Sequence, residues 1–116
     1  MATPTVLTPK PLISPQQLTA ANATYYTVPA STVTQLKEII LVNDTTTAVT
    51  ATIYIVPTGG SADDTNILLK AVNIPSDGTP VVFEFDSLFM AAATTIQGLA
   101  SVTAQVTIHL SGVELQ

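Results

Sequence analysis

Alternation of apolar and polar residues is the dominant pattern along this chain. It is clearest in residues 48–57 and 102–110, where apolar residues occupy every second position. A period of two indicates a strand with one buried face. The pattern and its turn signals predict strands over residues 24–29, 33–43, 48–57, 67–74, 81–86 and 102–110. Asp77-Gly78 is a tight-turn dipeptide between two of them. Residues 87–101 are ambiguous, and we expect short strand pieces near Leu88–Met90 and Thr94–Gln97.

The face of each strand follows from the same alternation. In residues 81–86, Val81, Phe83 and Phe85 are predicted to point inward, and Glu84 and Asp86 outward. The last strand is predicted to bury its even-numbered apolar residues, which are Val102, Ala104, Val106, Ile108 and Leu110. The phase then changes, because Val113 and Leu115 are odd-numbered. A β-bulge at Ser111-Gly112 would return both side chains to the core.

Strands spaced about ten residues apart, without a predicted helix, are typical of a β-sandwich or a barrel. The predicted fold class is therefore all-β, as an antiparallel β-sandwich. A jelly roll is the first choice among sandwiches, and an immunoglobulin-like sandwich is the second. The chain of 116 residues suggests one such domain, over residues 24–116, preceded by an extended arm over residues 1–23.

The arm combines prolines with large aliphatic residues. Proline fixes φ and lacks an N–H, so the segment can be neither a helix nor a central strand. A solvated linker does not need large aliphatic side chains such as those between these prolines. We interpret the arm as a clamp on a neighbouring subunit, and an arm folded back on its own sandwich as the other possibility. The predicted contact residues are Val6, Leu7, Leu12, Ile13 and Leu18.

Tyr25 and Tyr26 follow the arm directly. Because neighbouring residues of a strand point to opposite faces, one tyrosine is expected in the core. The other is a candidate partner-binding anchor, since tyrosine is enriched at interfaces.

Charge restricts the partners. Only 9% of the residues are charged, the cations are Lys10, Lys37 and Lys70, and the formal net charge is −5. Nucleic-acid binding and docking on an anionic membrane both need a cationic surface, so neither is expected. The sequence shows no apolar run long enough to span a membrane and no Sec-type signal peptide.

Candidate chemistry is sparse. His109 and Ser111 share a face of the last strand, but two such residues do not make a triad. Asp63 and Asp64, with Asn66 nearby, offer oxygens to a cation but do not match an EF-hand loop. The sequence therefore predicts no catalytic residues, no cofactor and no metal site, and the chain is not expected to be an enzyme.

Residues 25–60, YYTVPASTVTQLKEIILVNDTTTAVTATIYIVPTGG, carry a family resemblance. Together with ILLKAVNIPSDGTPVVFE and the terminal VTAQVTIHLSGVEL, they resemble a group of small tailed-bacteriophage virion proteins. Two features depart from that group: AAATTIQ replaces a glycine–aspartate turn, and the proline-rich arm is additional.

This resemblance implies a structural role and supplies no catalytic residues. The expected function is that of a capsid decoration, or cement, protein on the capsid surface of a virion assembled in the host cytoplasm. The expected partners are the major capsid protein and further copies of the chain, with a homotrimer favoured. A neck, tail or fibre-associated adaptor is the second interpretation, and a carbohydrate-binding module is the third.

Overall fold

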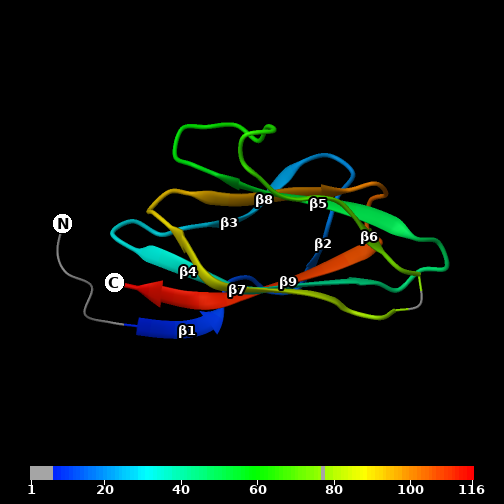
Figure 1. Cartoon of the computed structure of the whole chain (residues 1–116), viewed down its shortest axis with the longest axis horizontal. Coiled ribbons are helices and arrows are strands. Elements are labelled where there is room, and N and C mark those ends of the chain that lie inside the picture. The colour runs from blue at the N-terminus through cyan, green and yellow to red at the C-terminus, as the bar shows by residue number, and fades with distance from the viewer. Residues whose placement is uncertain (1–6, 77) are drawn as a thin grey trace.

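The computed structural model describes residues 7–76 and 78–116, and every regular element in these ranges is a β-strand (Figure 1). Asp77, predicted in a tight turn, lies outside the described residues, and Gly78 beside it has a φ of 79°. The strands are β1 (Leu7–Pro11), β2 (Gln16–Gln17), β3 (Ala23–Thr27), β4 (Val33–Asn43), β5 (Val49–Val56), β6 (Ile67–Ile74), β7 (Val81–Met90), β8 (Thr95–Ala100) and β9 (Val106–Leu115).

Two antiparallel sheets pack face to face as a sandwich. One sheet has the order β1-β9-β4-β7, with β2 also paired to β9, and the other has the order β3-β8-β5-β6. Since β1 and β2 lie one after the other along β9, they act as one interrupted strand. Eight strands in two four-stranded sheets, with the chain crossing between the sheets at nearly every connection, form a jelly roll. The prediction of an antiparallel, jelly-roll-like sandwich is confirmed.

The core lies between the sheets, and most of its residues are the inward side chains of the long strands. In β5, Val49, Ala51 and Ile53 are at most 1% exposed, as the alternation predicts. Fully burying a valine or isoleucine side chain stabilises the fold by about 1.5–3 kcal/mol. The other fully buried large side chains include Leu36, Ile39, Leu41, Ile74, Ile96, Ile108 and Leu110.

The last strand begins later than its apolar pattern indicates. β9 starts at Val106, and residues 101–104 form a turn instead. Val102, predicted in the core, is 41% exposed. Ala104, also predicted inward, is exposed and has a φ of 62°. Its N–H instead donates to the carbonyl oxygen of Leu18 at 3.0 Å, so the turn is held by the segment that follows β2.

The predicted bulge lies near the expected place but in a different strand. Between β4 and β9, Leu36 pairs with Gly112 and Glu38 with Ser111, so the extra residue is Lys37 of β4. β9 itself keeps its phase to its end, and its inward residue near the C-terminus is Glu114, which is 4% exposed. The prediction that Val113 and Leu115 return to the core is therefore wrong. Both are half-buried on the outer face of the sheet.

Gly112 is required by the close approach of β4 at this bulge. A Cβ atom at this position would collide with the backbone oxygen of Gln35 and would lie 3.3 Å from Cδ1 of Leu12. Backbone cannot move aside as a flexible side chain can, so the neighbouring strands would have to separate.

We expect Gly112→Ala to lower the free energy of unfolding by about 1–3 kcal/mol, because the added methyl group overpacks a backbone contact. Chemical denaturation of the two proteins measures the difference. Ser111→Ala, one residue away on the outer face, is the matched control and should change stability by less than about 0.5 kcal/mol. Equal stability of the Gly112 variant and the parent would contradict this account of the bulge.

Candidate functional site

Residues 7–17 of the predicted arm run antiparallel along β9 as the edge of a sheet (Figure 1), and Ala23, at the arm's end, is the first residue of β3. Leu7 pairs with Leu115 at one end, and Gln17 pairs with Thr107 at the other. Between β1 and β2, the N–H of Leu12 donates to the carbonyl oxygen of Leu110 at 2.9 Å. Pro9 and Pro11 fit this position because prolines are accepted on an edge strand, where the missing N–H is not needed.

The aliphatic residues of the arm have different environments. Leu12 and Leu18 are 8% and 0% exposed and belong to the core of this chain. No neighbouring subunit is needed to bury them, because the pairing of the arm with β9 directs both side chains into this chain's own core. Ile13 is half-buried against the core, and Leu7 is 67% exposed. Val6 lies outside the described residues.

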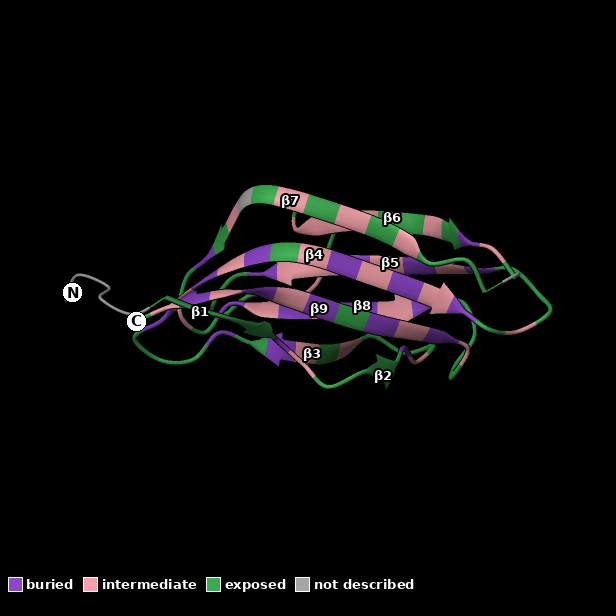
Figure 2. Cartoon of the chain, turned by 90° about the horizontal axis from the view of Figure 1, so that it is seen from below, coloured by how far each residue is buried: buried purple, intermediate pink, exposed green. Residues whose placement is uncertain are grey.

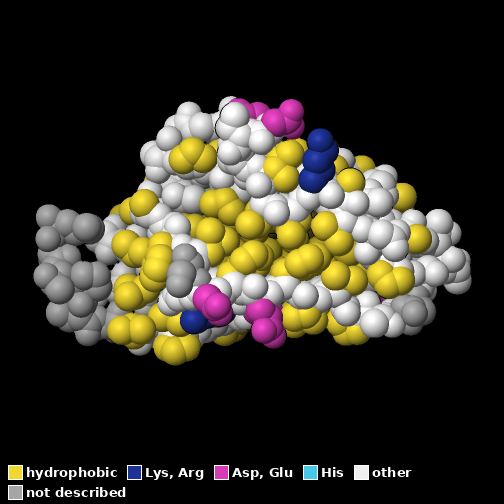
Figure 3. All heavy atoms as spheres, in the orientation of Figure 1, with side chains coloured by type: hydrophobic (Ala, Val, Ile, Leu, Met, Phe, Trp, Pro, Cys, Tyr) yellow, Lys and Arg dark blue, Asp and Glu magenta, His cyan; other side chains and the backbone are white. Residues whose placement is uncertain are grey.

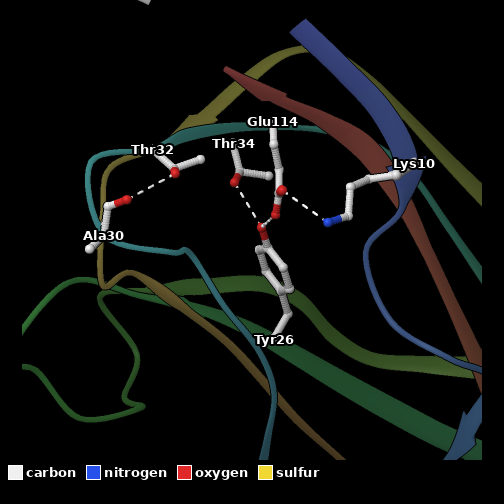
Figure 4. A network of polar contacts seen from close by, with 6 residues as sticks. All are labelled: Lys10, Tyr26, Ala30, Thr32, Thr34 and Glu114. Carbon is white, nitrogen blue, oxygen red and sulfur yellow. Dashed lines mark hydrogen bonds and ion pairs between the residues drawn. The ribbon is translucent and has the colours of Figure 1, made fainter. Parts of the chain in front are cut away.

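A polar network lies beneath the arm, between the two sheets (Figure 4). The Tyr26 hydroxyl of β3 donates to Oε2 of Glu114 in β9 at 2.6 Å. Since a phenol has one hydrogen, Thr34 of β4 is the donor in its 2.8 Å contact with Tyr26. Nζ of Lys10, from β1, lies 3.0 Å from Oε1 of Glu114. We call these four residues the arm clasp, because they join the arm to both sheets.

The arm clasp consists of groups that already satisfy one another. The hydrogen bond from Tyr26 lowers the pKa of Glu114, against the opposing effect of burial, and Lys10 lowers it further. Burial, followed by the hydrogen bond to Glu114, raises the pKa of Tyr26 above its ordinary value. At neutral pH the carboxyl is therefore ionised and the phenol protonated. Each oxygen of the carboxylate accepts a bond, so this site suits holding the arm rather than proton transfer.

Both tyrosines contact the arm or its clasp. Tyr26 is the core residue of the pair, at 8% exposure, and Tyr25 is half-buried. The pairing of β3 with β8 shifts between Thr24 and Tyr26, which leaves Tyr25 as the extra residue. The Tyr25 hydroxyl accepts a hydrogen bond from the N–H of Thr19 at 3.1 Å.

The other candidate residues do not converge on the clasp. His109 is exposed on the outer face of β9, opposite Ile40, and Ser111 is half-buried two residues on. The Asp63 carboxylate accepts hydrogen bonds from the hydroxyl and N–H of Thr65 at 2.6 and 2.8 Å, which lower its pKa. These bonds form a local turn in the loop that also contains Asp64. Among the described residues, no three His, Cys, Asp or Glu side chains are grouped to hold a metal ion.

Sequence reasoning did not identify Glu114 or Lys10 as site residues. The signal was present, since Glu114 is in phase with the buried Val106, Ile108 and Leu110. A carboxylate at an inward position needs partners, which Lys10 and Tyr26 supply. The assumed phase change at Ser111-Gly112 concealed this, because it placed Glu114 on the outer face.

Comparison with known proteins identifies the fold alone. No protein family and no curated protein matches the sequence. Among solved structures, 95% of this chain matches 31% of a chain in the structure of infectious bursal disease virus, Gx strain, with a TM-score of 0.51 and 14% identity. The Gt strain of that virus gives a TM-score of 0.47, 11% identity, and coverage of 95% and 30%. The chain thus spans about a third of the length of the viral chain that it matches.

The match to the Gx strain supports a sandwich of the kind found in a virus structure and does not single out tailed bacteriophages. Membership of that group stays a prediction. Residues 7–76 and 78–116 contain no helix with the length and apolar character needed to cross a membrane.

We expect Glu114→Gln to reduce stability by about 1–3 kcal/mol at pH 7, because the charge-assisted bond from Tyr26 is weakened. The folded-state pKa of Glu114 lies below its ordinary value of 4.5. Its ionised form therefore stabilises the fold above that pH, and this contribution is lost as the pH falls through the folded-state pKa. Denaturant unfolding at pH 7 and at pH 3 should show the difference between variant and parent shrinking in acid.

Glu84→Gln is the control for this pH dependence, because Glu84 is exposed on β7. The Glu84→Gln protein should lose as much stability between pH 7 and pH 3 as the parent does. A Glu114→Gln protein that loses as much stability in acid as the parent would show that Glu114 does not carry this dependence.

Proposed function

We propose that this chain is a structural protein of a tailed-bacteriophage virion that binds the assembled capsid and stabilises it, as a decoration or cement protein. The observation that carries the proposal is the jelly roll, which matches part of a virus chain over 95% of the present chain. The sequence resemblance to small phage virion proteins supports the same role independently. The low charge content supports a surface that packs against other proteins, since charged residues are depleted from interface cores.

The arm is the proposed contact with a neighbouring subunit, either the major capsid protein or another copy within a trimer. Leu12 and Leu18 anchor it in this chain's own core, and the Lys10–Glu114 ion pair fixes its course. Leu7, which is 67% exposed, and Ile13 then remain to contact the neighbour, together with Val6. An arm held in place binds with less loss of conformational entropy than a free one.

Stabilisation of the capsid would follow from linkage. A protein that binds only the assembled shell favours that state, by about 2.7 kcal/mol per site when its free concentration is 100 times its Kd. No catalytic step is needed for this role, and the capsid surface is the proposed location.

The first test is the number of copies per particle, measured by quantitative mass spectrometry of purified virions against the most abundant shell protein. A number comparable to that of the shell protein is the expected result. A single ring of copies would instead identify a neck or tail adaptor. Absence from particles would reject a virion role and leave the carbohydrate-binding interpretation to be tested by a glycan screen.

Leu7→Asp should weaken binding to particles that lack this protein by on the order of tenfold to a hundredfold, because one large apolar contact is replaced by a charge. Its melting temperature should stay close to that of the parent, since Leu7 is exposed. Gln16→Asp, on the exposed strand β2, adds the same charge and should bind normally. Undiminished binding by the Leu7 variant would argue against a contact at this end of the arm.

A further inference from the structure

The jelly roll has a closed side, where buried side chains separate the core from solvent, and an open side, where the side chains over the core are half-exposed. β2 and β3 lie on one side of the molecule, and the edge strands β6 and β7 lie together on the opposite side (Figure 2). Leu12 and Leu18 close the first side. On the second, large apolar side chains cover the core but remain half-exposed. They are Leu68, Leu69 and Val72 of β6, and Val81, Phe83, Phe85 and Leu88 of β7.

On this open side, packing within the chain explains the apolar side chains of β7 least well. All three phenylalanines of the chain are on β7, and none of them is buried. Phe89 is 57% exposed and Val82 is 47% exposed, both on the outer face of the sheet. From Val81 to Phe89, every residue of β7 whose exposure is described is half-buried or exposed (Figure 2). Aromatic side chains are instead enriched where proteins contact each other.

The backbone of β7 also has a free edge. In the sheet order β1-β9-β4-β7, its strand neighbour among the described residues is β4 alone. A long apolar edge strand is a template for pairing with another chain. The space-filling view shows apolar side chains in a band along this side, with acidic side chains at the lower rim near the course of β7 (Figure 3).

The charges on this edge select among possible partners. Glu84 and Asp86 are exposed on β7, and Glu38 pairs with Glu84 from β4. Against these three carboxylates, β4 and β7 carry a single cationic residue, Lys37. Two copies of β7 paired antiparallel about Phe85 would place Glu84 of one against Asp86 of the other, and like charges directly opposite are destabilising. The acidic residues therefore disfavour pairing of this edge with itself in that register.

We infer that β7 is the docking edge for an extended segment of the shell protein in which apolar residues alternate with lysine or arginine. Such a segment would add a strand beside β7, with its apolar side chains against Phe83 and Phe85 and its cations on the other face, against Glu84 and Asp86. This inference rests on the proposed function. A further copy of this chain is a poor source of the cations, since it has three lysines and Lys10 is paired to Glu114.

The test compares a Glu84→Lys/Asp86→Lys variant with the parent in binding to particles that lack this protein. We expect the variant to bind about tenfold more weakly or worse, and binding of the parent to weaken with added salt. Asp44→Lys/Asp64→Lys is the matched control, because it makes the same change in net charge at exposed loop positions. Hydrogen exchange should show β7 amides of the parent becoming protected on the particle.

Unchanged binding by the β7 variant, or unprotected β7 amides in bound protein, would overturn the inference and leave the proposed function standing. If the parent does not bind particles, the proposed function fails, and a second probe decides on the edge itself. That probe is a short capped peptide of alternating valine and lysine, compared with one carrying glutamate in place of lysine. Selective protection of β7 by the lysine peptide would support the edge. Equal effects of the two peptides, or self-association of the free chain through β7, would overturn it.

Discussion

The pairing of the arm with β9 is the interaction on which the rest of the structure depends. Without it, β9 would become an exposed edge, and Leu12 and Leu18 would leave the core. Glu114 would also lose Lys10, one of its two charge-compensating contacts. A carboxylate withdrawn from water is tolerated only while its partners remain in place. The arm is therefore required both for apolar burial, through Leu12 and Leu18, and for polar satisfaction, through Lys10.

The arm clasp also restricts how the arm can sit. Lys10 pairs across the strands with Gly112, and its ammonium reaches Glu114 two residues further along β9. A slip by one residue would turn Leu12 outward and move Lys10 away from the interior. A segment rich in proline has few backbone bonds with which to define its register, so the ion pair and the two buried leucines define it instead. Hence a polar contact and an apolar contact specify the same alignment.

The architecture followed from the sequence because most strands are half-buried and their alternation is visible. β4 and β6 have the predicted bounds, and β5 differs from its prediction by one residue at each end. The errors at the C-terminal end of β9 have one physical origin, which is that alternation reports phase but not the strand that carries a bulge. Placing the extra residue in β9 rather than at Lys37 sent Val113 and Leu115 inward and Glu114 outward. The clasp was missed for the same reason, since its central residue was assigned to the wrong face.

The two sides of the sandwich show how charge is distributed in a chain that has little of it. On the arm side, Glu114 is buried and compensated within the chain. On the β7 side, Glu84 and Asp86 are exposed beside half-buried phenylalanines, and no ion pair among the described residues compensates them. Charged residues on an edge strand ordinarily prevent edge-to-edge association, but they do not require aromatic residues beside them. The acidic residues of β7 disfavour pairing with a like edge, and the aromatic residues beside them favour contact with another protein. Together they fit an edge that is selective for a cationic partner.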